Sequence, residues 1–185
     1  MSSWVPRTTA PSYGDPYYTS TQQSLYTPAL NPYPDWGPYG FVLPNCTGLA
    51  AGRQLEQGYG AEICPANEFR DAWTWYAAAA NFYERGQDPR VGAIAVWSGG
   101  IGGHVATLEY YDPYTDTAQF SNSNYGGTVF YMTTTTGHNP YCFTGYTFLG
   151  YIYPAGQPKP SWFYPLICKK RRKQYGRPRI KRRAV

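Results

Sequence analysis

Residues 45–53 read "NCTGLAAGR", which places a cysteine directly after a good helix N-cap residue and ahead of a short alanine-rich run. An asparagine side chain accepts hydrogen bonds from the free backbone N–H groups at a helix start, so a helix is predicted from Asn45 through "CTGLAAGRQLEQ". Gly48 and Gly52 weaken this helix, which must therefore be held by tertiary packing. Cys46 itself is open to four interpretations: a buried core residue, half of a disulfide, a metal ligand or a nucleophile.

Downstream of this helix, the sequence predicts a second helix and then a series of β-strands. The segment "NEFRDAWTWYAAAANFYERG", residues 67–86, predicts a second helix with Asn67 as N-cap, Arg85 near the C-terminal end and Gly86 at C′. Short β-type runs follow at 93–97, 104–111, 117–121, 128–133 and 146–153, separated by Gly, Asp, Pro and Asn. Helices followed by a series of strands indicate an α+β fold, with N-terminal helices packed on an antiparallel β-sheet.

The length of 185 residues suits one domain with appendages. Residues 1–44 are rich in proline and tyrosine, which excludes regular helix and favours an irregular, extended arm whose later part packs on the domain. No apolar run approaches the ~20 residues of a membrane-spanning helix. The first residues also lack the charged-then-apolar layout of a signal peptide. We divide the chain into an arm (1–30), a domain (31–154) and a linker with a basic tail (155–185).

The net charge of +5 conceals a strong asymmetry. Residues 1–168 hold six Lys and Arg and all eleven Asp and Glu, whereas residues 169–185 hold ten cations and no acid. Such a tail typically pairs with a polyanion, either wall teichoic acid or acidic lipid, or alternatively nucleic acid, with the former favoured. The predicted polyanion-binding residues are Lys169, Lys170, Arg171, Arg172, Lys173, Arg177, Arg179, Lys181, Arg182 and Arg183.

Neither disulfides nor a metal site explains the four cysteines well. Their density is far below that of a disulfide scaffold, and none is paired in CxxC spacing. His138 and Cys142 are four residues apart, but "GHNPYC" has the composition of a loop rather than a helix. A thiol at a helix start, in contrast, feels the positive end of the peptide dipoles, which favours the thiolate and hence a nucleophile. A buried, inert cysteine is the competing interpretation.

A nucleophilic cysteine needs a base, and the chain has two histidines. His104 opens a predicted strand directly after "SGGIGG", a turn that permits close approach of backbone or substrate. In "FSNSNYGG", Asn122 and Asn124 share one face of a strand end. An asparagine oxygen that accepts from the imidazole Nδ1–H would leave Nε2 facing the thiol, as in a papain-like acyl-transfer site. The same asparagines are also ordinary turn residues.

Taken in order, these segments resemble the CHAP family of cysteine- and histidine-dependent amidohydrolases and peptidases. The resemblance rests on "LPNCTGLAAGR", "PRVGAIAVWSGG", "GGHVATLEYY", "FSNSNYGG" and "FLGYIYP", and covers about two-thirds of the chain. It implies a papain-like fold of the NlpC/P60 type and hydrolysis of amide bonds in bacterial peptidoglycan. It also implies that Cys46 is the nucleophile and His104 the base.

The resemblance places Asn122 where many members have a glutamate, and Asn124 where an asparagine often follows. An amide orients an imidazole but cannot stabilise the imidazolium by charge, so activity is expected to depend on thiolate–imidazolium pairing. Asn124 is an alternative to Asn122 in the orienting role. With no acidic calcium loop in the sequence, we predict neither a metal nor another cofactor.

The expected function is that of a phage endolysin or virion-associated lysin, present in the virion or the host cytoplasm and acting at the cell wall. Other virion proteins are possible partners. The alternative is a structural or binding virion protein with a CHAP-like fold, weak catalysis and a nucleic-acid-binding tail. The enzymatic interpretation requires that the Cys46 sulfur and the His104 imidazole meet within hydrogen-bonding reach across an open cleft.

Overall fold

The structure, a computed structural model, describes residues 4–12, 15, 17–18, 43–59, 71–81, 83–125, 127–136, 140 and 143–154. Several sequence predictions lie outside these residues, namely those on Cys64, Asn67, His138, Cys142, Cys168 and the basic tail.

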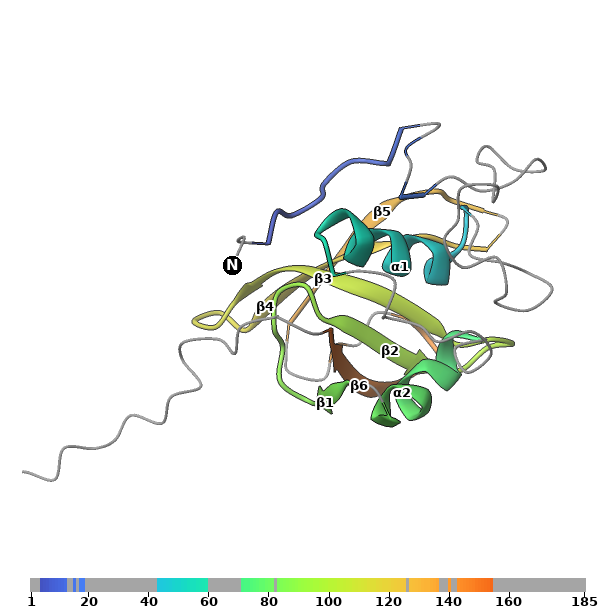
Figure 1. The fold of residues 1–185 in the computed structure, drawn as a ribbon. Coiled ribbons are helices and arrows are strands. Elements are labelled where there is room, and N and C mark those ends of the chain that lie inside the picture. Colours follow the sequence, from blue (N-terminus) through green and yellow to red (C-terminus); the bar gives the residue numbers. More distant parts are fainter. Residues whose placement is uncertain are drawn as a thin grey trace, which may run out of the picture.

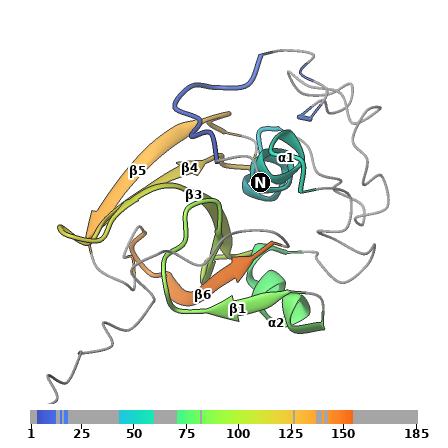
Figure 2. The same ribbon diagram turned by 60° about the vertical axis from the view of Figure 1, so that its left-hand side comes forward.

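A six-stranded antiparallel sheet forms the centre of the fold (Figure 1). Its strands are β1 (Glu84–Gly86), β2 (Ile94–Ser98), β3 (His104–Asp112), β4 (Thr117–Asn122), β5 (Tyr131–Thr136) and β6 (Thr147–Tyr153). Their order across the sheet is β1-β6-β2-β3-β4-β5, and every neighbouring pair is antiparallel. Figure 2 shows that the sheet is strongly curved. The α+β class is therefore confirmed. The five predicted strands correspond to β2–β6, with β5 starting three residues later than predicted.

Helix α1 (Cys46–Glu56) begins where the sequence predicts it. The Asn45 side chain accepts a hydrogen bond from the backbone N–H of Thr47 at 3.3 Å, so Asn45 is the N-cap. The N-terminal segment, described over residues 4–12, 15 and 17–18, approaches the helix closely at Gly52. A Cβ on Gly52 would be 2.4 Å from the Tyr18 ring. The glycine that weakens the helix thus permits this contact.

In the part that the structure describes, the predicted helix over 67–86 is confirmed over residues 72–81, although partly as 3-10 turns, and is wrong at its C-terminal end. Residues 72–81 form three short turns, η4 (Ala72–Thr74), α2 (Trp75–Ala78) and η5 (Ala79–Asn81), and residues 84–86 form β1. Tertiary pairing decides this, since Glu84–Gly86 pair with Tyr151–Tyr153 of β6. Arg85 still contacts the helical turn, where it donates to the Tyr76 carbonyl and lies over the Tyr76 ring.

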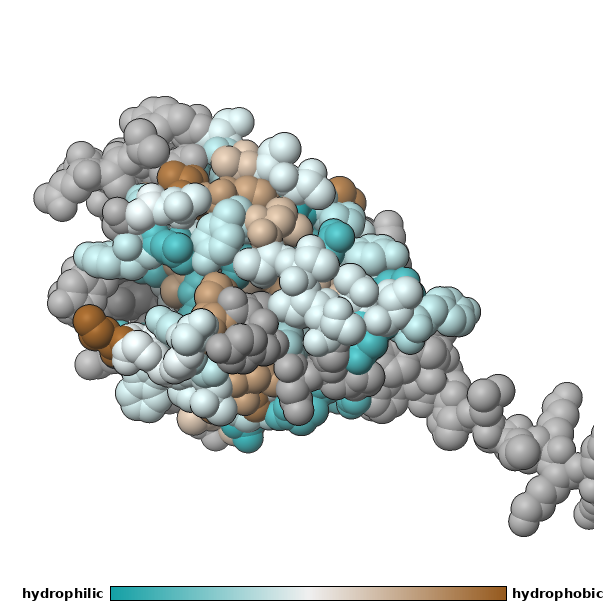
Figure 3. Space-filling model, turned by 180° about the vertical axis from the view of Figure 1, so that it is seen from behind, coloured by the Kyte–Doolittle hydropathy of each residue, from teal (hydrophilic) through white to brown (hydrophobic). Residues whose placement is uncertain are grey.

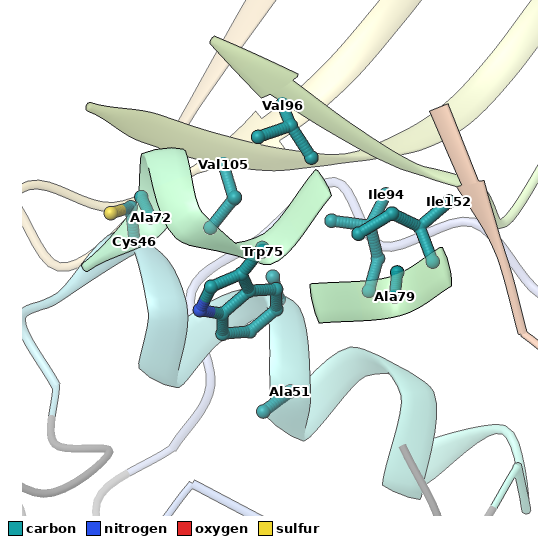
Figure 4. Packing of buried hydrophobic residues seen from close by; sticks show 10 residues of the cluster. Cys46, Ala51, Ala72, Trp75, Ala79, Ile94, Val96, Val105 and Ile152 are labelled. Carbon is teal, nitrogen blue, oxygen red and sulfur yellow. The ribbon is translucent and has the colours of Figure 1, made fainter. Parts of the chain in front are cut away.

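Each face of the sheet carries its own cluster of buried side chains. On one face, α1, η4, α2 and η5 pack against alternate residues of β2, β3 and β6 (Figure 4). Trp75 is fully buried there, against Ile94, Val96 and Val105. A second cluster uses the intervening residues of the same strands together with residues of β4, with Trp97 and Phe120 among its largest side chains. The alternation of side chains along each strand supplies two separate cores.

The N-terminal segment runs along the side of the sheet that carries α1 (Figures 1 and 2). Its contacts with the domain begin at Trp4, whereas the sequence analysis expected the later part of the arm to pack. Residues 19–42 lie outside the described residues, so the expectation for that part is not tested.

Hydrophobic and hydrophilic residues are interspersed on the face that Figure 3 shows. Within the described ranges, no helix is long and apolar enough to cross a membrane.

Candidate functional site

Cys46 is the first residue of α1, and its side chain lies between the helix and the start of β3. It packs in one cluster with Ala72 and Val105, and Figure 4 shows it next to Ala72. The side chain is 9% exposed. Burial raises the pKa of the Cys46 thiol, whereas hydrogen bonding from the backbone N–H groups of Val105, Thr47 and Cys46 lowers it. The prediction that the helix start favours the thiolate is therefore wrong, because desolvation outweighs the effect of the helix start on the thiol pKa.

His104 is the first residue of β3 and lies opposite Trp97 of β2. Its ring centroid is 6.0 Å from that of Trp97 and 4.5 Å from that of Phe143, and the residue is 7% exposed. Burial among these rings lowers the pKa of His104 to about 4, and the hydrogen bond with Asn122 acts in the opposite direction. The imidazole is therefore neutral at neutral pH, the form that can accept a proton.

Asn122, the last residue of β4, orients the His104 ring. Its Oδ1 is 3.0 Å from Nε2 of His104. Its Nδ2 donates to the Phe120 carbonyl at 2.9 Å and to Thr133 Oγ1 at 3.0 Å. Because both amide hydrogens are used, Oδ1 must face the imidazole, and Nε2 must carry the ring proton. The prediction from the sequence is that Nδ1–H makes this bond and Nε2 faces the thiol. In the structure the two nitrogens are exchanged, and Nδ1 is the basic atom.

Asn124 does not share this role. Its side chain is exposed, and its Oδ1 accepts a hydrogen bond from the Tyr131 hydroxyl at 2.8 Å. Of the two candidates that the sequence left open, the structure brings only Asn122 to the histidine.

The glycine-rich turn before His104 serves a close backbone approach. Gly103 has a φ of +72°, and a Cβ there would be 2.6 Å from the Trp97 carbonyl oxygen and 2.7 Å from Cβ of Trp73. The Trp73 N–H donates to the Gly102 carbonyl at 3.1 Å. Since Trp73 follows Ala72, this hydrogen bond joins the segment beside Cys46 to the turn that precedes His104. The sequence predicts that this turn permits close approach of either backbone or substrate, and the structure shows close approach of backbone.

Cys46 and His104 come from adjacent elements at one end of β3. A backbone N–H that faces the sulfur belongs to Val105, the residue after His104. Within the described residues, Asn122 supplies the side-chain hydrogen bond of the His104 ring, and the partners of the thiol are backbone N–H groups. Both side chains are largely buried, which differs from the open cleft that the sequence analysis required.

The aromatic residues near the site divide between core and surface. Trp97 is buried, and its Nε1 donates to the Pro140 carbonyl. Tyr110 and Tyr125 are exposed, and Tyr111 is partly buried.

A buried ion pair between Arg53 of α1 and Glu109 of β3 is not among the features predicted from the sequence. Two signals were present. Arg53 lies seven residues after Cys46, so it shares that side of the helix. Glu109 interrupts the apolar residues of β3.

A comparison with family models decides the classification. The model described as CHAP domain matches residues 35–124. The chain contains a CHAP domain. The match includes Cys46, His104, Asn122 and Asn124, and β5 and β6 continue the same sheet beyond it. A search of curated proteins found no match.

The CHAP domain implies a hydrolase of the amidase or peptidase class, commonly one that acts on peptidoglycan. A neutral imidazole held in one tautomer, at the end of a sheet and next to a helix that begins with cysteine, is compatible with this chemistry.

Proposed function

We propose that the protein hydrolyses an amide bond of bacterial peptidoglycan, with Cys46 as nucleophile and His104 as base. The hydrogen bond between His104 Nε2 and Asn122 Oδ1 carries this proposal. This hydrogen bond satisfies the polar groups of two buried side chains, His104 and Asn122. It uses Nε2 of the imidazole, so the lone pair on Nδ1 can accept a proton.

In the proposed reaction, Nδ1 of His104 takes the proton of the Cys46 thiol, and the thiolate attacks the amide carbonyl carbon. Backbone N–H groups at the start of α1, including that of Cys46, stabilise the resulting oxyanion. The imidazolium then protonates the amine, which leaves, and a thioester remains on Cys46. Water activated by His104 hydrolyses the thioester, releasing the acid and restoring the thiol.

The electrostatics of the site favour a neutral resting pair. Burial raises the pKa of Cys46 and lowers that of His104, so thiol and imidazole are both uncharged at neutral pH. Asn122 provides no negative charge to stabilise an imidazolium. Proton transfer therefore accompanies attack on the substrate, in place of the preformed thiolate–imidazolium pair that the sequence analysis expected.

We extend the proposal to a papain-like arrangement of the NlpC/P60 type. Its support is the combination of an N-capped helix that begins at Cys46 with an antiparallel sheet that provides His104 and Asn122 from neighbouring strands. The helix packs on β3, whose first residue is the proposed base.

The phage origin and the role of the tail are further parts of the proposal. We assign the protein to an endolysin or a virion-associated lysin that acts at the cell wall from the virion or the host cytoplasm. Ten cations in residues 169–185 support a polyanionic partner, preferably teichoic acid or acidic lipid. These residues lie outside the described part of the structure.

The decisive experiment compares Cys46→Ala with the unaltered protein on purified sacculi, by turbidity and by mass spectrometry of the newly formed termini. We expect Cys46→Ala and His104→Gln to abolish the release of new termini. Asn122→Ala should lower the rate, while the matched variant Asn124→Ala should not. Lysis by Cys46→Ala at the rate of the unaltered protein would refute the proposal.

A second candidate function is a structural or binding protein that retains a CHAP domain without useful catalysis. The burial of both Cys46 and His104 favours it, because a nucleophile must reach its substrate. The same experiment separates the two candidates, since this one predicts no new termini from the unaltered protein while it binds sacculi.

A further inference from the structure

Glu109 of β3 is a buried carboxylate with an unusually complete set of donors. The residue is 1% exposed, and Arg53 binds it in a bidentate manner, with Nε 2.7 Å from Oε1 and Nη2 2.8 Å from Oε2. Ser121 Oγ donates to Oε1 at 2.7 Å. Trp4 Nε1 and the Arg7 backbone N–H donate to Oε2 at 2.9 and 3.1 Å. The two carboxylate oxygens of Glu109 thus accept five hydrogen bonds, which compensate for the loss of solvent around the buried charge.

Glu109 and three of these donors, two from Arg53 and one from Ser121, belong to the elements that carry the candidate catalytic residues. Arg53 is on α1, which begins at Cys46, and Glu109 is on β3, which begins at His104. Ser121 directly precedes Asn122 on β4. One carboxylate therefore joins the helix of the nucleophile, the strand of the base and the strand of the orienting amide.

The N-terminal segment completes the surroundings of the ion pair. The Val5 carbonyl accepts from Arg53 Nη2 at 2.7 Å, and the Trp4 ring covers the guanidinium, with its centroid 4.7 Å from Cζ. Arg53 is fully buried. A buried ion pair stabilises a fold only when its remaining donors and acceptors are satisfied. In this chain, Trp4, Val5 and Arg7, which lie outside the matched CHAP region, provide some of these hydrogen bonds.

A second set of contacts fastens the same segment to the end of α1. Glu56 pairs with Arg7, whose Nη2 lies 2.6 Å from Oε1, and it also accepts from Arg53 and from the Tyr18 hydroxyl. These interactions hold the pKa of Glu56 below its usual value despite partial burial. The segment is therefore attached through charged groups at two successive turns of the helix, at Arg53 and at Glu56.

We propose that Glu109 is a positioning residue that sets Cys46, His104 and Asn122 relative to one another. The described residues of the N-terminal segment, chiefly Trp4 and Arg7, contribute to this positioning. This inference rests on the proposed function. Loss of the Trp4 or Arg7 contacts leaves Glu109 short of donors, and the carboxylate then shifts relative to Ser121 and Arg53. A displacement of about 1 Å at a catalytic group costs on the order of 100-fold in rate.

The test uses the full chain with Glu109→Gln and Trp4→Phe. The first removes the charge, and the second keeps an aromatic ring over Arg53 but removes the Nε1–H donor. Glu84→Gln is the matched control, because it breaks a salt bridge with Arg90 at the β1 edge and leaves these contacts intact. Two readouts are needed: kcat and KM on sacculi, and the His104 tautomer from long-range ¹H–¹⁵N NMR. The chain has two histidines, so His138→Gln assigns the spectrum.

We expect Glu109→Gln and Trp4→Phe to lower kcat by roughly 10- to 100-fold with KM changed less than about twofold, and to convert the single Nε2–H tautomer of His104 into a mixture. Glu84→Gln should change neither readout. Folded variants that keep both the rate and the single tautomer would overturn the inference. If Glu109→Gln does not fold, Trp4→Phe decides.

The outcome separates this inference from the proposed function. If the unaltered protein and Cys46→Ala behave alike on sacculi, the proposed function fails. The tautomer readout then still decides whether Glu109 and the N-terminal segment position His104.

Discussion

Acidification should destabilise this protein through one identifiable residue, His104. The ring is buried between Trp97 and Phe143, and its hydrogen-bonding side chain, Asn122, is uncharged. The pKa of His104 therefore falls from 6.5 to about 4 in the folded protein. In the unfolded chain the imidazole regains its ordinary pKa, so the unfolded state binds more protons than the folded state between these pH values.

The sign and size of the effect follow from this difference. The contribution of the neutral ring to stability is fully present above about pH 6.5, is lost progressively as the pH falls towards 4, and is constant below that. Each tenfold difference in proton affinity is worth about 1.4 kcal/mol, so the total loss approaches about 3 kcal/mol. That is a large part of the ~5–15 kcal/mol that stabilises a typical domain.

Urea unfolding followed by tryptophan fluorescence from pH 4 to 8 measures this loss. The matched variant is His104→Gln, whose amide can still donate to Asn122 but does not titrate. Other titrating groups, such as Glu56, contribute equally to both proteins. We expect the free energy of unfolding of the unaltered protein to fall by about 3 kcal/mol more than that of His104→Gln between pH 7 and pH 4. Parallel pH dependences in the two proteins would refute the assignment of a buried, neutral imidazole.

Two further substitutions test the geometry of the site. Asn122→Asp places a carboxylate against Nε2 of His104, which stabilises the imidazolium, so the acid limb of kcat/KM on sacculi should move up by about one to three pH units; an unmoved limb would contradict the hydrogen bond. Gly103→Ala combines a φ of +72° with a Cβ only 2.7 Å from Trp73, so thermal or urea unfolding should show a loss of more than about 2 kcal/mol. Gly145→Ala is its control, because a φ of +79° with open space around the Cβ costs only about 1 kcal/mol, and equal losses would argue against the close contact at Gly103.

The local elements on which the site is built are predictable from the amino-acid sequence alone. The start of α1 is a local feature, because Asn45 caps the helix by accepting from Thr47, two residues along the chain. The sequence also placed His104 correctly at the start of β3 and Asn122 at the end of β4. Strand alternation and glycine-rich turns are local signals, since they depend on residues next to one another in the chain. For the same reason the α+β class was predictable.

The interactions that join distant segments depend on how the chain packs in three dimensions, and the sequence did not predict them. The expected helix over 67–86 gives way to β1 because Glu84–Gly86 find partners in β6, 65 or more positions away. The ring nitrogen that Asn122 binds, the neutral state of His104 and the donors around Glu109 likewise depend on burial and on contacts between elements. Desolvation is a property of what surrounds a group in space, and neighbours in sequence do not specify it. The sequence therefore located the chemical groups, and the packing set their charge and orientation.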